Sequence, residues 1–244
     1  MHFPRHALHL LAVATMGLAG TCVAAFAIAA EGAGAPANPA AAVLDLRRQQ
    51  PVTGDAQAGK AQSAVCSACH GANGVGVAPN FPSLAGQSAT YLYVQLRTFK
   101  DGQRSDPVMA AMAASIVDAD MRNLAAYYAS LPPTAGANGA RALRGATLFD
   151  SGDPSLGIPP CQACHGADGS GPRAAADVGA AAPRPPWSTV PRLQGQSGAY
   201  VAKALHDFKG GARGGTSNAA IMHGVAQSLD DADIQALADF IDAR

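Results

Sequence analysis

Two five-residue stretches decide the fold of this chain. Residues 66–70 read Cys-Ser-Ala-Cys-His, and residues 161–165 read Cys-Gln-Ala-Cys-His. In this pattern the two thiols can add to the vinyl groups of a haem, and the histidine that follows is then held beneath the iron. The residues concerned are Cys66, Cys69 and His70 in the first stretch and Cys161, Cys164 and His165 in the second. We therefore expect two covalently attached haem c groups.

Three other kinds of site use paired cysteines: a thioredoxin-like dithiol, a zinc site and ordinary disulfides. A redox dithiol does not need a histidine directly after its second cysteine, yet here that histidine occurs twice. A zinc site of this type expects a second cysteine pair about 15–20 residues further on. Cys69 and Cys161 are much further apart than that. The recurrent histidine therefore favours haem over all three alternatives.

The N-terminus has the character of an export signal. Residues 1–30 contain Arg5 near their start and then continue to Ala30 without another Asp, Glu, Lys or Arg. The run ends near an Ala-x-Ala cleavage site, but it is also long enough to cross a bilayer as a helix. We expect either a cleaved signal peptide or an uncleaved membrane anchor. Residues 31–54, rich in Ala, Pro and Gly, are expected to form a flexible spacer.

The charge balance and the aromatic content of the chain limit the functions that it can have. Its 244 residues carry 17 basic and 17 acidic side chains, so the overall balance contains no nucleic-acid footprint. We expect no nucleic-acid partner. Aromatic residues make up only 5% of the chain, which leaves little side-chain bulk for the cores of two small domains. A large prosthetic group in each domain would supply that bulk.

The two halves of the chain are repeats of each other. Residues 70–74, 82–88 and 116–130 align in turn with residues 165–169, 191–197 and 229–243. Each repeat predicts an all-α unit with one helix before the motif, one after the capping serine Ser88 or Ser197, and one at its end. Apolar residues spaced by three and four in the closing segments predict one buried stripe per repeat. These residues are Met121, Leu124, Ala125 and Tyr128, and Ile234, Leu237, Ala238 and Ile241.

Alignment of the halves narrows the choice of the sixth iron ligand. Met222 is the only methionine of the second half, and Met109 occupies the equivalent place in the first. Met112 and Met121 align with Val225 and Ile234, which indicates packing roles. His223, next to Met222, is the main rival because imidazole also binds haem iron. His206 is expected to be a solvated helix residue. A histidine and a methionine on one iron raise its reduction potential, which suits an electron carrier.

With two Cys-x-x-Cys-His units, each followed by Pro-x-Leu-x-Gly-Gln and then by a methionine, the chain resembles the dihaem cytochrome c4 family. Residues 80–87 and 125–130 are especially similar to the first domain of that family. The resemblance implies two class I cytochrome c domains facing each other, with the haem propionates near their interface. It also implies that the carbonyls of Pro82 and Pro191 accept hydrogen bonds from the proximal histidines.

Family members are periplasmic, either soluble or attached to the membrane. The resemblance implies that they carry electrons from the cytochrome bc complex toward terminal oxidases. Related dihaem modules serve as electron-accepting subunits of flavin- or quinone-dependent dehydrogenases. We expect an electron carrier and not an enzyme, although a small dihaem peroxidase is a third possibility if one iron has an open or displaceable sixth position.

The expected organisation is a pair of tandem cytochrome c-like domains, residues 55–131 and 141–244, joined by a linker at 132–140. The second half departs from the first by an insertion between His165 and Gln196 that holds the single tryptophan, Trp187. Two interpretations are open for Trp187. It either packs against its own domain in a surface loop or forms an exposed element that docks a partner.

Overall fold

Helices are the only regular elements in the part of the chain that the structure describes. The computed structural model describes residues 43–136, 142–172 and 187–244, and within these ranges it adds only three isolated β-bridges to the helices. The expected all-α fold class is therefore confirmed. Ala40–Arg244 form one compact unit, and every contact discussed below lies within it.

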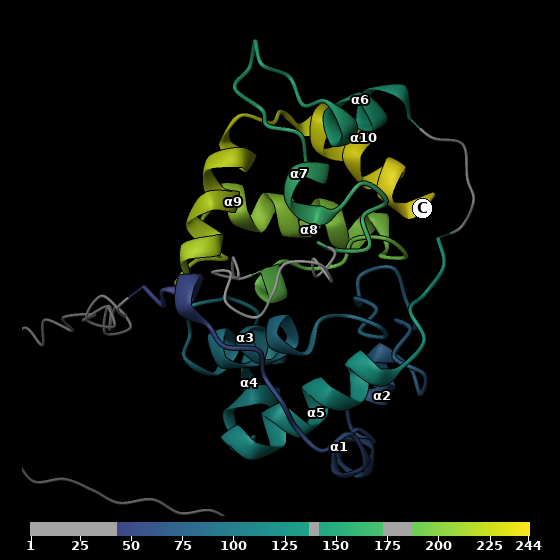
Figure 1. Ribbon diagram of the computed structural model, residues 1–244, viewed down its shortest axis with the longest axis vertical. Helices are drawn as coiled ribbons and strands as arrows, with labels where there is room; N and C mark the ends of the chain where they lie inside the picture. The colour runs from purple at the N-terminus through teal and green to yellow at the C-terminus, as the bar shows by residue number, and fades with distance from the viewer. Residues whose placement is uncertain (1–42, 137–141, 173–186) are drawn as a thin grey trace, which may run out of the picture. The chain divides into compact units, whose positions relative to one another are not determined.

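The helices follow the repeat that the sequence contains (Figure 1). The first half holds α1 (Ala56–Gln62), α2 (Ser67–His70), α3 (Ala89–Lys100), α4 (Pro107–Ala114) and α5 (Asp118–Ser130). The second half holds α6 (Leu143–Asp150), α7 (Gln162–His165), α8 (Gly198–Lys209), α9 (Ser217–Gln227) and α10 (Asp231–Asp242). Two short 3-10 helices, η1 (Leu46–Arg48) and η2 (Trp187–Thr189), complete the set.

Two of these helices, α4 and α9, were not expected from the sequence. The Asp106 side chain accepts a hydrogen bond from the Met109 amide, and Pro107 occupies the first helical position, where its missing N–H costs nothing. Thr216 caps α9 in the same way, accepting from Ala219 N at 3.0 Å. These start signals were visible in the sequence, but the Ala-rich composition of both segments hid their apolar face.

The serine caps behave differently in the two halves. Ser88 precedes α3 and its hydroxyl accepts from Tyr91 N, as predicted. Ser197 precedes α8 but makes no capping bond with its side chain. Its hydroxyl instead donates to the carbonyl of Pro79 at 2.5 Å, in the other half of the molecule. Ser88 makes the equivalent contact, donating to the carbonyl of Ser188, and keeps its cap as well.

Both predicted apolar stripes lie in the cores. Met121, Leu124, Ala125 and Tyr128 of α5 are buried, as are Ile234, Leu237, Ala238 and Ile241 of α10. Met121 is completely buried in the first core and is therefore a packing residue, as its alignment with Ile234 indicated. Cys66 packs on the edge of the first core and Cys161 on the edge of the second. The first cysteine of each motif thus packs against the core that contains one of these stripes.

A glycine allows the first and last helices of each half to cross closely. α1 packs on α5, and α6 packs on α10 (Figure 1). A Cβ atom on Gly59 would lie 2.0 Å from the carbonyl oxygen of Asn123, and one on Gly145 would lie 2.0 Å from that of Ala236. No side chain fits between backbones this close. Both glycines are therefore required by the helix crossing.

The chain before α1 differs from the expected flexible spacer, because its described part contacts both halves. Leu44 pairs with Thr216, donating to Gly215 O at 2.8 Å and accepting from Ser217 N at 3.0 Å. Leu46 is buried in the core of the first half, and Val52 N donates to Thr90 Oγ1 at 2.9 Å. Residues 43–52 therefore form a strap that connects the loop before α9 to the first core.

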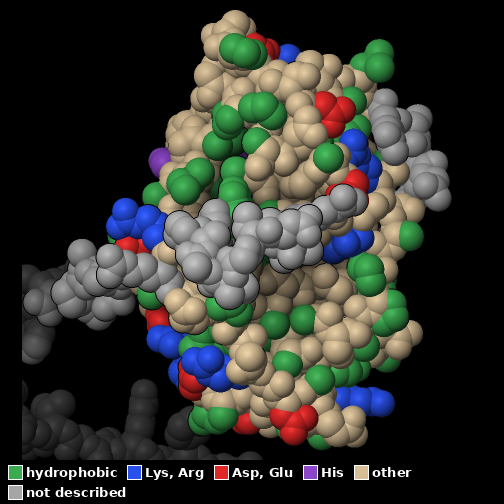
Figure 2. Space-filling view, viewed as in Figure 1, with side chains coloured by type: hydrophobic (Ala, Val, Ile, Leu, Met, Phe, Trp, Pro, Cys, Tyr) green, Lys and Arg blue, Asp and Glu red, His purple; other side chains and the backbone are tan. Residues whose placement is uncertain are grey.

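The surface agrees with the balanced composition. On the face shown in Figure 2, basic and acidic side chains are interspersed and do not gather by sign. Among the described residues, no helix is both long enough and apolar enough to cross a membrane. The expected leader, residues 1–30, lies outside them.

Replacing Gly59 with alanine tests the close crossing of α1 and α5. Because the added methyl group must push two backbones apart, we expect Gly59→Ala to lower the free energy of unfolding by about 1–3 kcal/mol. Chemical denaturation of the holoprotein measures this change. The matched control is Gly224→Ala in α9, where the new Cβ meets nothing within 4 Å and improves helix propensity by up to about 1 kcal/mol. Equal stabilities of the two variants would contradict the close-crossing interpretation.

Candidate functional site

Each cysteine motif forms a single helical turn that ends in a buried histidine. α2 begins after Cys66 and ends at His70, and α7 begins after Cys161 and ends at His165. The next residue is a glycine in the left-handed region, with φ of 72° at Gly71. Only glycine adopts this conformation without strain. It turns the chain sharply away after the histidine and leaves the imidazole facing the domain interior.

A backbone carbonyl orients each imidazole. Nδ1 of His70 lies 2.9 Å from the carbonyl oxygen of Pro82, and Nδ1 of His165 lies 3.0 Å from that of Pro191. A carbonyl can only accept, so Nδ1 must carry the proton and donate it. The Nε2 lone pair of each ring is therefore free to bind a metal. The structure brings each predicted histidine together with its predicted proline.

Burial keeps both imidazoles neutral. It lowers the pKa of His70, against a smaller opposing effect of the bond to Pro82. It also lowers the pKa of His165, and there the positive charge of Arg213 acts in the same direction. Neutral imidazole is the form that binds iron. Burial thus keeps each imidazole in the neutral form that can bind a metal.

The thiols are suited to covalent attachment of a cofactor. All four motif cysteines are free and none forms a disulfide. Burial raises the pKa of Cys66 and raises that of Cys161 to about 11, so both are protonated thiols in this structure. Two free thiols beside a buried neutral imidazole are the groups that a c-type haem requires. The residues present therefore fit that group in both halves.

The two methionines predicted as ligands occupy helices of their own. Met109 lies in the first turn of α4, which packs on α3, and Met222 lies in α9, which packs on α8. Both side chains are half-buried, and Met222 packs against Phe208, Ala219 and Ala226. Met112 is also half-buried, on the same helix as Met109.

The two candidate histidines of the second half are exposed. His223 follows Met222 in α9, and its Nδ1 lies 2.7 Å from the carbonyl oxygen of Phe208. His206 lies on the surface of α8, with Nδ1 4.0 Å from a carboxylate oxygen of Asp231. The exposure of His206 agrees with the solvated role that the sequence indicated.

A layer of two buried arginines between the halves was missed by the sequence analysis. Arg104 donates to Tyr200 Oη at 2.9 Å, and Arg213 donates to Tyr91 Oη at 2.6 Å. Both guanidinium groups also bind Gln95 Oε1, at 2.8 and 2.9 Å. Each arginine comes from one half and reaches the tyrosine of the other, so the contacts are reciprocal. The signal was present, because Arg104 and Arg213 align when the repeats are overlaid.

These arginines carry positive charge into the interior. Each is only 7% exposed, and each lies over an aromatic ring of its own half, Phe99 at 4.4 Å and Phe208 at 4.3 Å. Among the described residues, neither guanidinium has a carboxylate within 4.0 Å. A buried charge normally has a counter-charge. The carboxylate of Asp207 supplies a more distant negative charge that acts on Arg104.

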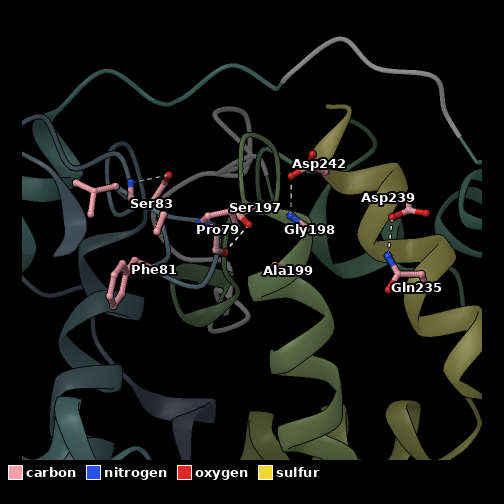
Figure 3. Close-up of a pocket in the computed structure, with 12 residues that line it drawn as sticks. Pro79, Phe81, Ser83, Ser197, Gly198, Ala199, Gln235, Asp239 and Asp242 are labelled. Atoms are coloured by element: carbon pink, nitrogen blue, oxygen red, sulfur yellow. Dashed lines mark hydrogen bonds between the residues drawn. The ribbon is translucent and has the colours of Figure 1, made fainter.

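Two hollows lie where the halves meet, and they are related by the repeat. The larger, about 570 Å³, is formed by the loop after α2 and the N-terminus of α8, with part of α10 (Figure 3). The smaller, about 280 Å³, is formed by the loop after α7 and the residues leading into α3. Trp187 lines the smaller hollow and is 38% exposed. The rest of its inserted loop, residues 173–186, lies outside the described residues.

Comparison with known proteins agrees with this geometry. The family model described as Cytochrome c matches the chain twice, over residues 56–132 and 142–243. Cytochrome c4 of Pseudomonas aeruginosa is 39% identical over 189 residues, which cover 77% of this chain and 88% of that protein. The crystal structure of reduced recombinant cytochrome c4 from Pseudomonas stutzeri has a TM-score of 0.68 at 37% identity and covers 78% of this chain and 99% of that one.

A further relative carries a different name. The thiosulfate dehydrogenase electron acceptor of Thiomonas intermedia is 38% identical over 188 residues, covering 75% of this chain and 80% of that protein.

Both halves of the chain thus match one family model, and the relatives match across both halves together. The free thiols and the buried neutral histidines agree with the two covalently bound haem c groups that such domains carry. The chain belongs to the cytochrome c family and, within it, to the dihaem cytochromes c4, which transfer electrons.

Proposed function

We propose that this chain carries single electrons through the periplasm, from the cytochrome bc complex toward a terminal oxidase. The observation that supports this role most directly is the pair of buried imidazoles, each fixed through Nδ1 by a proline carbonyl. A ligand held this rigidly moves little between the two oxidation states of a metal. Little rearrangement on gain or loss of an electron is what a carrier needs.

Each proposed site combines one histidine with one methionine. His70 and Met109 would hold the iron of the first domain, and His165 and Met222 that of the second. When bound, haem c supplies an iron that changes between its ferrous and ferric states, and the thioether favours the ferrous one. The complete burial of Met121 in the first core supports Met109 over it. The exposure of His223 supports Met222 in the second.

The surrounding residues have supporting roles in this proposal. The thiols of Cys66, Cys69, Cys161 and Cys164 anchor the two haems covalently. Arg104 and Arg213 would offset the negative charge of the haem propionates. If a histidine and a methionine hold each iron, neither iron would have a position open to peroxide. We therefore propose a carrier without catalytic activity of its own.

The proposed location rests on the leader. Residues 1–30 have the composition of an export signal, and haem c proteins with this type of signal work outside the cytoplasm. The protein would be periplasmic, either soluble after cleavage or tethered by an uncleaved leader.

Substitution of single methionines tests the ligand assignment. In Met109→Leu we expect the absorption band of the methionine–iron bond to fall to about half, because one of two such bonds is lost. Met112→Leu, on the same helix, is the matched control and should leave the band unchanged. In the second domain, Met222→Leu should halve the band and His223→Gln should not. An intact band in Met109→Leu or Met222→Leu would refute the corresponding assignment.

A second candidate function is supported by one of the relatives. Because the thiosulfate dehydrogenase electron acceptor of Thiomonas intermedia is 38% identical over most of the chain, an electron-accepting role beside a dehydrogenase also deserves a test. The family resemblance likewise implies a dehydrogenase as a partner, in a flavin- or quinone-dependent form. In this role the catalytic chain is separate and the present chain receives its electrons.

Reduction kinetics distinguish the two roles. We expect the oxidised holoprotein to be reduced by the cytochrome bc complex with quinol at least about tenfold faster than by a thiosulfate-oxidising dehydrogenase with thiosulfate. Stopped-flow absorbance of the haem bands measures both rates. The opposite order, or purification of the chain in a stable complex with a dehydrogenase subunit, would support the second role over the first.

A further inference from the structure

The glutamine that ends each Pro-x-Leu-x-Gly-Gln segment crosses to the other domain. Gln196 of the second domain accepts from Ser83 N at 2.9 Å and donates to Ser83 O at 3.0 Å. Gln87 of the first domain accepts from Arg192 N at 2.8 Å and donates to Arg192 O at 2.9 Å. Both glutamines are buried. Each side-chain amide thus pairs with one backbone residue of the opposite domain through two hydrogen bonds.

These glutamines are fixed before they reach across. The Oε1 atom of Gln87 also accepts from Ser88 N at 3.0 Å, and that of Gln196 from Ser197 N at 3.2 Å. The side chain is therefore held in one orientation by its own backbone. A preorganised donor and acceptor pair costs less entropy to engage than a mobile one. The cross-domain contact is consequently a stiff one.

The backbone residue that each glutamine binds follows the proline that orients a histidine. The peptide group between Pro82 and Ser83 accepts from His70 Nδ1 at its carbonyl and donates to Gln196 at its N–H. The group between Pro191 and Arg192 does the same for His165 and Gln87. A peptide group is planar, so holding its N–H also aims its carbonyl. Hydrogen bonds at the two ends of one peptide group strengthen each other.

We propose that Gln196 is a positioning residue for the haem site built on His70, and that Gln87 is a positioning residue for the site built on His165. Each domain thereby supplies the group that sets the strength of the histidine hydrogen bond in the other. A stronger bond at Nδ1 makes the imidazole a more basic ligand, which favours ferric iron and lowers the reduction potential. The proposal rests on the proposed role of the two histidines as iron ligands.

Two neighbouring serine hydrogen bonds make it possible to distinguish a positioning role from a role that only holds the domains together. Ser197 Oγ donates to Pro79 O, and Ser88 Oγ donates to Ser188 O in the mirrored place (Figure 3 shows the first). Both serines hold the same loops as the glutamines, but at a residue three positions before the proline. Loss of such a bond weakens the contact between domains without touching the peptide group that binds the histidine.

The experiment uses the reduced holoprotein labelled with 15N-histidine. NMR then measures how fast the Nδ1 protons of His70 and His165 exchange with solvent. Methionine is as long as glutamine but cannot form these bonds. In Gln196→Met we expect exchange at His70 to accelerate about tenfold, the effect of losing a net hydrogen-bond contribution, while His165 is unchanged. Gln87→Met should give the mirrored result, with acceleration at His165 alone.

Site-resolved redox titration of the same variants supplies the second readout. The reduction potential should rise at the haem of the opposite domain and stay unchanged at the haem of the substituted domain. Ser197→Ala is the matched control, because it removes a cross-domain bond to the same loop and its side chain caps no helix. In Ser197→Ala the Nδ1 proton of His70 should not exchange faster than that of His165. If Gln196→Met does not fold, Gln196→Asn, which keeps the amide but is too short to reach Ser83, should give the same crossed pattern.

Three results would overturn the proposal: equal acceleration at both histidines, acceleration only in the substituted domain, or no change at all. Failure of the proposed function is recognised separately. In that case the unsubstituted protein would already lack histidine–iron signals or would not accept electrons from any of its tested donors.

Discussion

The bond from a buried imidazole to a proline carbonyl is the constraint on which the rest of each domain depends. The motif helix is a single turn, too short to fix a side chain by itself. The carbonyl must therefore come from elsewhere in the chain, and the loop that carries it is held in place by a shared acceptor. In the first domain Leu84 N and Ala85 N both donate to Gly74 O, and in the second Leu193 N and Gln194 N both donate to Gly169 O.

The contact between the domains is built from reciprocal polar side chains. Each half provides an arginine, a tyrosine and a glutamine, and each of these side chains finds its partner in the other half. Polar groups taken out of water are costly unless all are satisfied. Because the halves are repeats of each other in sequence, a group that satisfies one side has an equivalent that satisfies the other. The buried polar groups of these side chains can then all find hydrogen-bond partners.

The halves are nevertheless not equivalent around their motifs. Tyr128 of α5 has a buried hydroxyl close to Cys66, and burial raises the pKa of that hydroxyl. The aligned residue of α10 is Ile241, which is purely apolar. Arg213 adds its positive charge near His165, whereas no such charge is resolved at His70. The surroundings of the two proposed iron sites therefore differ in polarity, although their ligands are of the same types.

The sequence by itself determined the chemistry of each half, because that chemistry is local. Two thiols and an imidazole within five residues can serve one haem wherever the chain leads, and apolar residues at helical spacing predict the buried faces of α5 and α10. The repeat then pointed to Met109 and Met222 by position alone. The helices that carry them escaped notice, since their Ala-rich sequences have no clear polar face.

Only the tertiary structure decided how the halves depend on each other. Gln87 and Gln196 are ordinary polar residues in sequence, and nothing nearby reveals that each binds the backbone beside the other domain's histidine. Arg104 and Arg213 likewise look like surface charges until the fold buries them. Residues 43–52 resemble a flexible spacer in composition, yet Leu46 finds a core. These roles arise from contacts between residues far apart in the chain, which local patterns do not encode.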